Sequence, residues 1–287
     1  MHITPEARGF GAKITGLDLS QPLDEETVRK IRAAWHAHQV VYFPDQPMTH
    51  EDLERFTRYI GAFGEDPYIA PLADNPHILE LRREPDEKAI VFGASWHSDW
   101  SFLATPPAAT ILHAKVIPPV GGDTLFASGY LAYDALGDAF GDAMKERVGT
   151  LFGIHSAAMP YGDEGVFAKE KEARTMKILP SVEANRTQRH PLVRIHPETG
   201  QRSLFVNQVY TIRLEGPDLH TEQASALLGQ LCEHATQDRF LYRHRWQPDM
   251  LIVWDNRCVQ HSAEGGYDGH RRLMHRTTVA GEAPIAA

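Results

Sequence analysis

Apolar residues recur at helical spacing in three stretches of the chain. Asp24 stands in a position to cap the first stripe, and Thr49 with Asp52 forms a capping-box pattern ahead of the second; Thr221 precedes the third. The apolar residues of the stripes are Val28, Ile31 and Trp35, then Leu53, Phe56 and Ile60, then Ala224, Leu227, Leu228, Leu231, Cys232 and Ala235. We expect three helices that pack these faces on a core.

Short apolar, β-branched and aromatic runs between Gly and Pro residues occupy much of the remaining chain. They include residues 40–43, 109–112, 203–206 and 250–254. The cluster at residues 118–123 predicts a turn between two strands. Many strands and few helices after about residue 90 are typical of a sandwich or jelly roll. Because no repeat or linker-like tract interrupts the chain, we predict one mainly β domain over residues 1–287, with helices on its outside.

Composition narrows the class of partner. The chain has 287 residues and a formal net charge of −9, which argues against a nucleic-acid partner but leaves a small anionic ligand open. The first residues lack the pattern of a secretory signal, and no window approaches a membrane-spanning length. The two cysteines lack metal or redox spacing. We therefore expect a cytoplasmic protein with no membrane partner.

The strongest chemical signal is the sequence Trp96-His97-Ser98-Asp99. In a strand, residues two apart share a face, so His97 and Asp99 would converge on one point. His261, directly after a strongly apolar strand, offers a third ligand. Two histidines and one carboxylate form the facial triad of Fe(II) oxygenases, which leaves metal positions open for cosubstrate and O₂. A lone His-x-Asp pair is a weak signal, since many are surface or hydrogen-bonded residues.

A basic strand follows His261. In Arg271–Arg276, Arg272 and Arg276 would lie on the same face. An arginine that points inward beside a metal needs an anionic partner, which a bidentate carboxylate would supply. Ion pairs with other side chains are the alternative for both arginines.

The motifs WHSDWSF, PPAATILHAKVIPPVGGDTLF, WDNRCVQH and RRLMHRTTV, in this order, resemble the taurine dioxygenase and 2,4-dichlorophenoxyacetate dioxygenase family. The resemblance covers nearly the whole chain. It implies a double-stranded β-helix, which is a jelly roll flanked by helices, and a homo-oligomer, because the family commonly forms dimers or tetramers. It also implies Fe(II) with 2-oxoglutarate and O₂ as cosubstrates.

The resemblance assigns roles to residues around the metal. His97, Asp99 and His261 would bind iron, while Trp254 and Asn256 would support the site from behind. Related halogenases lack the carboxylate ligand, so its presence here favours hydroxylation.

Three further residues match positions for cosubstrate and substrate. The Thr124 hydroxyl and the Arg272 guanidinium would hold the distal carboxylate of 2-oxoglutarate, and Arg276 would meet the acidic group of the substrate or lie beside it.

The substrate pattern departs from that of the taurine enzymes. Those carry His and Tyr after their Phe-Gly-Glu motif and Asn four residues before the first ligand, where this chain has Gly93. Residues 81–84 and 206–210 look more like the aryloxypropionate dioxygenases of the family. Tyr210 and Asn207 are candidate substrate-binding residues, although Tyr210 could belong to the core and Asn207 could satisfy a turn.

We favour an aryloxyalkanoate-like carboxylate, whose C–O bond breaks after hydroxylation. A sulfonate or alkyl sulfate is the alternative within the family. Two other classes remain open: a zinc hydrolase on the same three ligands, and a non-catalytic jelly-roll binding protein. Neither gives Thr124 and Arg272 a role. Residues 162–189, rich in Glu and Lys, could form a loop over the site or a solvated face.

Overall fold

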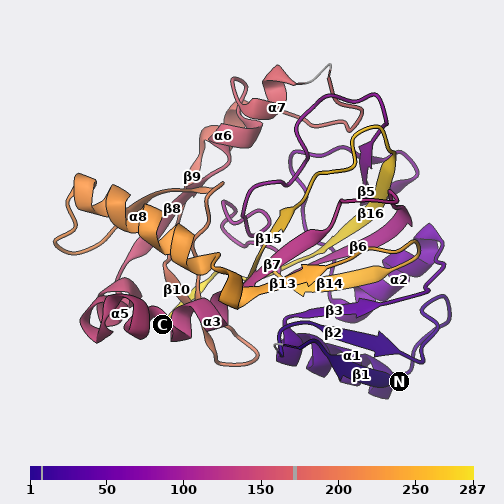
Figure 1. Cartoon of the computed structure of the whole chain (residues 1–287), viewed down its shortest axis with the longest axis horizontal. Coiled ribbons are helices and arrows are strands. Elements are labelled where there is room, and N and C mark those ends of the chain that lie inside the picture. The colour runs from indigo at the N-terminus through magenta and orange to yellow at the C-terminus, as the bar shows by residue number, and fades with distance from the viewer. Residues whose placement is uncertain (8, 171–172) are drawn as a thin grey trace.

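The main sheet of the computed structural model has eight strands in the order β1-β2-β3-β14-β6-β16-β5-β4 (Figure 1). The structure describes residues 1–7, 9–170 and 173–287. All neighbours in this sheet pair antiparallel except β2 with β3. Its strands are His2–Pro5 (β1), Ala12–Thr15 (β2), Val40–Phe43 (β3), Pro71–Leu72 (β4), Asn75–Arg83 (β5), Ala109–Val116 (β6), Leu251–Asp255 (β14) and Arg272–Val279 (β16).

A smaller sheet covers one face of the main sheet. It has the order β13-β7-β15 and consists of Leu241–His244 (β13), Thr124–Ser128 (β7) and Val259–Ala263 (β15). Phe126, Tyr242 and Val259 of this sheet share one hydrophobic cluster with Ile252 and Met274 of the main sheet. Two sheets that bury a common core face to face form the predicted jelly roll, which is confirmed.

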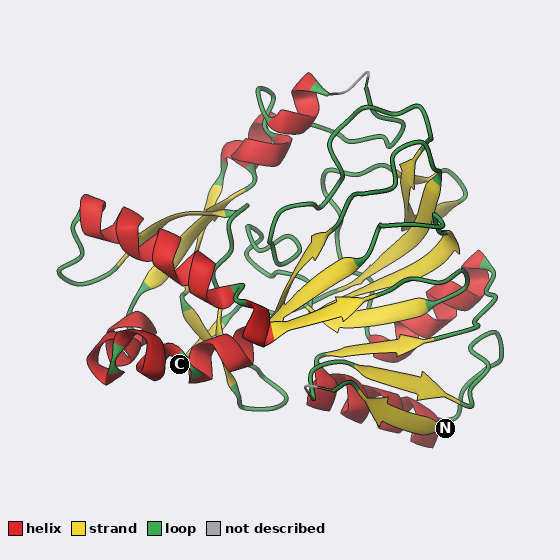
Figure 2. Cartoon of the chain, viewed as in Figure 1, coloured by secondary structure: helices red, strands yellow, loops and turns green. Residues whose placement is uncertain are grey.

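Two helices cover the other face of the main sheet (Figure 2). They are α1 (Glu25–His38) and α2 (His50–Ile60), and their apolar stripes pack with strand residues in one cluster. Asp24 accepts from the Thr27 amide at 2.7 Å, and Thr49 with Asp52 forms the predicted capping box. Both helix predictions are confirmed.

A helical lobe continues from the jelly roll and buries a separate core. The third predicted helix is found here as α8 (Thr221–Ala235). The other helices are α3 (Gly129–Asp134), α4 (Leu136–Phe140), α5 (Asp142–Gly149), α6 (Ala158–Tyr161) and α7 (Val166–Lys169), with 3₁₀ turns at Val182–Asn185 (η1) and Asp238–Phe240 (η2). The lobe strands are Phe152–Ser156 (β8), Thr187–Pro191 (β9), Val193–Ile195 (β10), Arg202–Leu204 (β11), Thr211–Glu215 (β12) and Ile285–Ala286 (β17). The expectation of few helices after residue 90 was therefore wrong for residues 129–149.

The predicted strands and the predicted turn are all present, with small shifts at the ends. The strand at residues 40–43 matches β3, and that at 109–112 extends to Val116 in β6. The strand at 203–206 is shorter than expected because the chain turns at Asn207, whose carbonyl accepts from the Thr211 amide at 3.3 Å. Residues 118–123 form the loop between β6 and β7.

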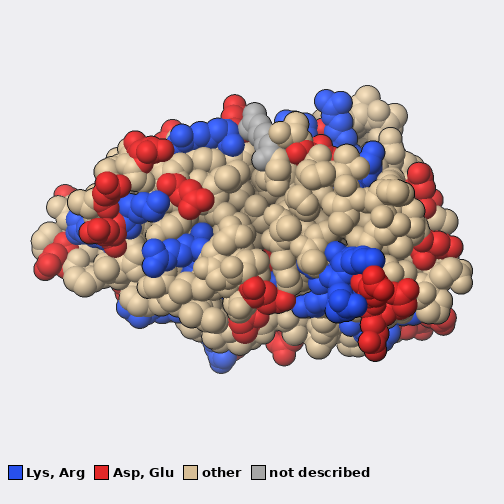
Figure 3. Space-filling model, turned by 90° about the horizontal axis from the view of Figure 1, so that it is seen from below, with Lys and Arg blue, Asp and Glu red and all other residues tan. Residues whose placement is uncertain are grey.

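The exterior carries charges of both signs. On the face shown in Figure 3, acidic and basic side chains lie next to one another around uncharged areas. Within residues 1–7, 9–170 and 173–287, no helix has the length and apolar character needed to cross a membrane.

Candidate active site

A loop brings the first two predicted ligands to the smaller sheet. His97 pairs with His261 of β15 through two main-chain hydrogen bonds, at 3.1 Å and 2.8 Å. The expectation that His97 and Asp99 lie in a regular strand was wrong, because this isolated bridge is the only ladder contact described for this segment. The bridge fixes the loop to β15 and places the ligand atoms of His97, Asp99 and His261 within 4.8 Å of one another.

Each of the two histidines presents a ring nitrogen to the site. His97 Nδ1 lies 2.7 Å from the Ser95 carbonyl, to which it can donate, and Nε2 lies 3.6 Å from Asp99 Oδ1. Burial, together with His97, lowers the pKa of His261 to about 3. Two imidazoles and one carboxylate, all buried and close together, fit a divalent transition-metal ion.

A relay of hydrogen bonds orients the carboxylate. Thr110 donates to Asp99 Oδ2 at 2.7 Å, Asn256 donates to Thr110 at 2.9 Å, and Trp254 donates to Asn256 at 2.9 Å. Thr110 and Trp254 are cross-strand partners on β6 and β14. The relay therefore connects Asp99 to two central strands of the main sheet. It shows how Trp254 and Asn256 could support the site, the role predicted for them from the sequence. Thr110 was not among the residues predicted from the sequence.

Thr110→Val tests this relay. The change keeps the side-chain volume but leaves two buried polar groups unpaired, so we expect unfolding to become easier by about 1–3 kcal/mol. Metal affinity should fall by roughly 10–100-fold, since Asp99 loses its orienting donor. Thr277→Val is the matched control. The buried Thr277 hydroxyl makes a 2.7 Å hydrogen bond to the Thr57 hydroxyl and takes no part in the relay to Asp99. A Thr110 variant with unchanged metal affinity would show that the relay does not orient Asp99.

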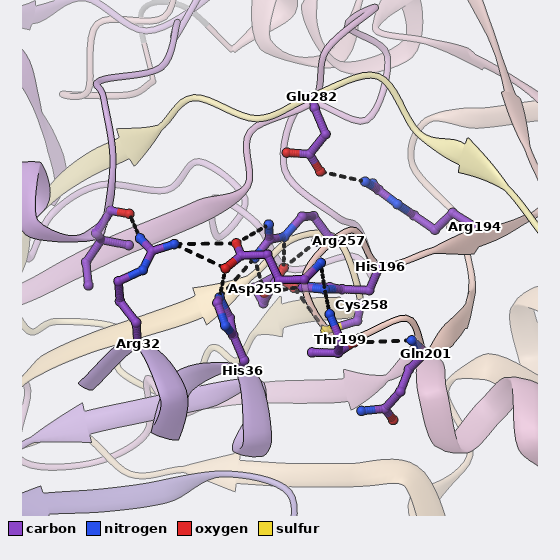
Figure 4. A network of polar contacts seen from close by, with 12 residues as sticks. Arg32, His36, Arg194, His196, Thr199, Gln201, Asp255, Arg257, Cys258 and Glu282 are labelled. Carbon is purple, nitrogen blue, oxygen red and sulfur yellow. Dashed lines mark hydrogen bonds and ion pairs between the residues drawn. The ribbon is translucent and has the colours of Figure 1, made fainter. Parts of the chain in front are cut away.

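The turn that carries Asn256 is held by a buried ionic network (Figure 4). Asp255 accepts from Arg257 Nε at 2.8 Å and Nη2 at 2.7 Å, and it lies 3.0 Å from His196 Nε2. Burial opposes the charge of Asp255, but Arg257 outweighs it and keeps the pKa of the carboxyl low. Arg257 also donates to Glu198 at 3.0 Å. The network therefore locks the β14–β15 turn directly behind the metal site.

Thr124 and Arg272 lie together in a pocket beside His97 and His261. Trp246 Nε1 donates to Thr124 Oγ1 at 3.0 Å, so the hydroxyl hydrogen of Thr124 remains free to donate. Arg272 lies 6.0 Å from the Trp246 ring and 5.9 Å from the Tyr267 ring. Trp246 was not singled out by the sequence.

Arg272 is a cation without an acidic partner among the described residues. Its Nε is buried without a hydrogen bond, and burial lowers its pKa. The loop that faces it needs Gly122, whose φ is +74° and whose added Cβ would come within 3.4 Å of Arg272 Nε. A cation held in this way beside a free hydroxyl donor is suited to a carboxylate ligand.

Arg276 lies deeper, between two carboxylates. Its Nη1 is 3.3 Å from Asp99 Oδ1, its Nη2 is 3.5 Å from Asp66 Oδ1, and its guanidinium carbon is 5.2 Å from the centre of the Trp100 ring. Burial opposes the charge, but Asp99 and Asp66 raise the pKa of Arg276. Nε and Nη2 nevertheless have no hydrogen-bond acceptor within the described residues.

A second pocket shares His97 and is lined mainly by apolar and aromatic residues. Tyr210, a candidate substrate-binding residue, lines it, while Asn207 lies behind Tyr210 and accepts from its amide at 2.8 Å. Burial raises the pKa of Tyr210 and of Tyr161, so both hydroxyls stay protonated. The lining residues are Ile90, Val91, Phe92, Gly93, Ala94, Ser95, His97, Met159, Pro160, Tyr161, Val166, Phe167, Val209 and Tyr210.

Part of the segment at residues 162–189 covers this second pocket. Val166 and Phe167 of α7 line it, and Arg174 donates to the Ile90 carbonyl at 2.8 Å from the other end of the segment. Residues 171–172 lie outside the described residues.

Comparison with known proteins decides the family. Residues 2–278 match the model of the family described as taurine catabolism dioxygenase TauD, TfdA family. The chain belongs to this family. The chain is similar to the alpha-ketoglutarate-dependent sulfate ester dioxygenase of Pseudomonas putida, with 32% identity over 99% of this chain and 91% of the relative. The (S)-phenoxypropionate/alpha-ketoglutarate-dioxygenase of Sphingobium herbicidovorans is 32% identical over 98% of this chain and 95% of the relative.

Solved structures agree with this assignment. A taurine dioxygenase from Burkholderia xenovorans superposes with a TM-score of 0.79 at 29% identity, covering 99% of this chain and 92% of that chain. AAD-2, solved with Mn(II) and N-oxalylglycine, gives a TM-score of 0.74 at 28% identity, covering 100% of this chain and 99% of that chain. The TauD/TfdA-family protein is thus an oxidoreductase, an alpha-ketoglutarate-dependent dioxygenase that uses Fe(II), 2-oxoglutarate and O₂. The hydrolase and binding-protein alternatives do not agree with this membership.

Proposed function

We propose that this dioxygenase, one catalytic domain over residues 1–287, hydroxylates an aryloxyalkanoate-like carboxylate at the carbon that bears the ether oxygen. The product is a hemiacetal or hemiketal, which collapses to a phenol and a carbonyl compound. The observation that carries the proposal is the apolar pocket beside His97, where Tyr161, Phe167 and Tyr210 offer flat aromatic surfaces to an aryl ring. The similar phenoxypropionate dioxygenase acts, by its name, on such a substrate.

The metal and its cosubstrate occupy the other side of His97 in this proposal. His97, Asp99 and His261 hold Fe(II), and Arg272 with Thr124 orients the distal carboxylate of 2-oxoglutarate. Bound iron, with 2-oxoglutarate and O₂, supplies the oxidising chemistry that inserts one oxygen atom into a C–H bond. The protein supplies position and a pocket with little water.

Arg276 receives the substrate anion. Two of its buried nitrogens, Nε and Nη2, have no hydrogen-bond acceptor among the described residues. Asn207, proposed from the sequence as a substrate contact, acts by holding the Tyr210 backbone. Asn207 also donates to Ser101 at 3.0 Å, which ties the Tyr210 turn to the Asp99 loop.

A sulfonate or alkyl sulfate is the second candidate substrate class. The similarity to a sulfate ester dioxygenase favours it, because Arg276 can pair with a sulfate as well as with a carboxylate. We also propose a cytoplasmic homo-oligomer, a dimer or a tetramer, which light scattering on the purified protein would test.

Succinate formation with a substrate panel tests the proposed function. We expect phenoxyacetate or 2-phenoxypropionate to raise succinate release over the substrate-free rate by at least about tenfold, with one phenol formed per coupled turnover. Taurine and a medium-chain alkyl sulfate are included for comparison. If only the sulfate or sulfonate stimulates succinate, the second candidate class replaces the first. If no anion of either class does, the proposed substrate chemistry is wrong.

A further inference from the structure

Asp66 approaches Arg276 at Nη2, whereas Asp99 approaches it at Nη1. It lies in the loop between α2 and β4, and its side chain is 10% exposed. Its Oδ1 accepts from Trp100 Nε1 at 2.7 Å and from Thr278 Oγ1 at 3.0 Å. These two donors, from the loop after Asp99 and from β16, hold the carboxylate 3.5 Å from Arg276 Nη2. Neither the metal site nor the cosubstrate pocket accounts for Asp66.

Arg276 and Asp66 form an ion pair that has no hydrogen bond. At 3.5 Å and without a hydrogen bond, Asp66 neutralises the guanidinium, while Nε and Nη2 find no acceptor among the described residues. Asp99, the other neighbour, is the carboxylate proposed to bind the metal ion. Asp66 is therefore the carboxylate that remains with Arg276 once Asp99 shares its charge with a metal.

Two carboxylates, Asp66 and Asp99, lie against the single guanidinium of Arg276. Burial raises the pKa of Asp66, whereas Arg276, Trp100 and Thr278 oppose this by stabilising its carboxylate. Two carboxylates around one guanidinium leave an excess of negative charge beside the metal site, which favours a cation and disfavours an anion.

We propose that Asp66 is a specificity-determining residue that weakens Arg276 as an anion receptor and strengthens the neighbouring site for a divalent metal. It acts through Arg276, by competing with the acidic group of the substrate and by keeping the guanidinium from pairing with Asp99 alone. The inference rests on the proposed function only in treating Arg276 as the substrate's partner. Its effect on the metal needs no knowledge of the substrate.

Asp66→Asn tests the inference, because the amide oxygen can still accept from Trp100 and Thr278 while the charge is lost. We expect Mn(II) affinity, measured by calorimetry on the full-length protein, to fall by about tenfold. Affinity for phenoxyacetate and for butane sulfonate, measured on protein loaded with Mn(II) and N-oxalylglycine, should rise by about tenfold. Glu65→Gln is the matched control, since it removes the adjacent exposed charge and should change neither affinity.

Opposite signs distinguish this role from a structural one. If the substitution only loosened the site, the variant would bind both the metal and the anions more weakly. If both affinities stayed unchanged, the charge of Asp66 would have no effect on either site. Either result overturns the inference. If neither probe anion binds, the metal measurement alone decides. Succinate formation by the unaltered protein separately tests the proposed function, so failure of one does not imply failure of the other.

Discussion

Asp99→Asn is expected to lower 2-oxoglutarate-dependent succinate formation by at least about a thousandfold, because a bound metal contributes several kcal/mol to such reactions. The asparagine oxygen can still accept from Thr110, so the relay to Asn256 stays intact. What is lost is the one negative charge among the proposed ligands. Without it, only the two imidazoles remain beside Arg276, whose cation lies 3.3 Å from the Asp99 carboxylate. Metal content should fall with activity.

Two measurements separate this effect from misfolding. Arg276 keeps a second carboxylate in Asp66, so we expect the metal-free variant to remain folded by circular dichroism. Asp268→Asn removes the same charge from an exposed side chain that pairs with Arg83, and it should leave metal content and turnover unchanged. If the Asp99→Asn variant kept one metal ion per chain and near-normal turnover, Asp99 would not be a metal ligand.

Local signals in the sequence predicted the helices well. Asp24 and the Thr49–Asp52 box act within one helical turn, so they mark α1 and α2 regardless of the rest of the fold. The apolar runs of β3 and β14 were equally visible because both strands are buried along nearly their whole length. By contrast, α3, α4 and α5 have between five and eight residues each, which is too short for a helical stripe to stand out.

The metal cluster was predicted for a reason that is only partly right. The i, i+2 argument assumed a strand, whereas the bridge to His261 and a turn after His97 bring the donors together. Such a bridge joins segments far apart in the chain, so no local pattern indicates it. Trp100, directly after Asp99, has a φ of +46°, an uncommon backbone conformation for a bulky residue, and its ring supports Arg276.

The supporting residues were harder to find. Thr110 is a polar residue in a mostly apolar, buried strand, and a buried polar residue of this kind usually has a hydrogen-bond partner. Asp66 and Trp246 follow no periodic pattern, and their importance rests on contacts with Arg276 and Thr124 from distant segments. Asn207 shows the reverse case, since a polar residue beside Tyr210 proved to bond the turn instead of lining the pocket.

Arg272→Met is expected to weaken 2-oxoglutarate binding by at least about 100-fold, since losing one partner of a buried charge pair costs about 2–5 kcal/mol. The same change should not destabilise the free protein by more than about 1 kcal/mol, because no described carboxylate pairs with Arg272 and methionine can keep contact with the Trp246 and Tyr267 rings.

Calorimetry with Mn(II)-loaded protein gives the affinity, and denaturant unfolding of the metal-free protein gives the stability. Arg82→Met is the matched control, because Arg82 lines the same pocket but already pairs with Glu80 at 3.2 Å and Glu84 at 3.6 Å. Equal losses of affinity in the two variants would mean that the pocket attracts 2-oxoglutarate by its general charge. A loss confined to Arg272 would mean that this one buried guanidinium, which has no acidic partner among the described residues, is the receptor for the cosubstrate.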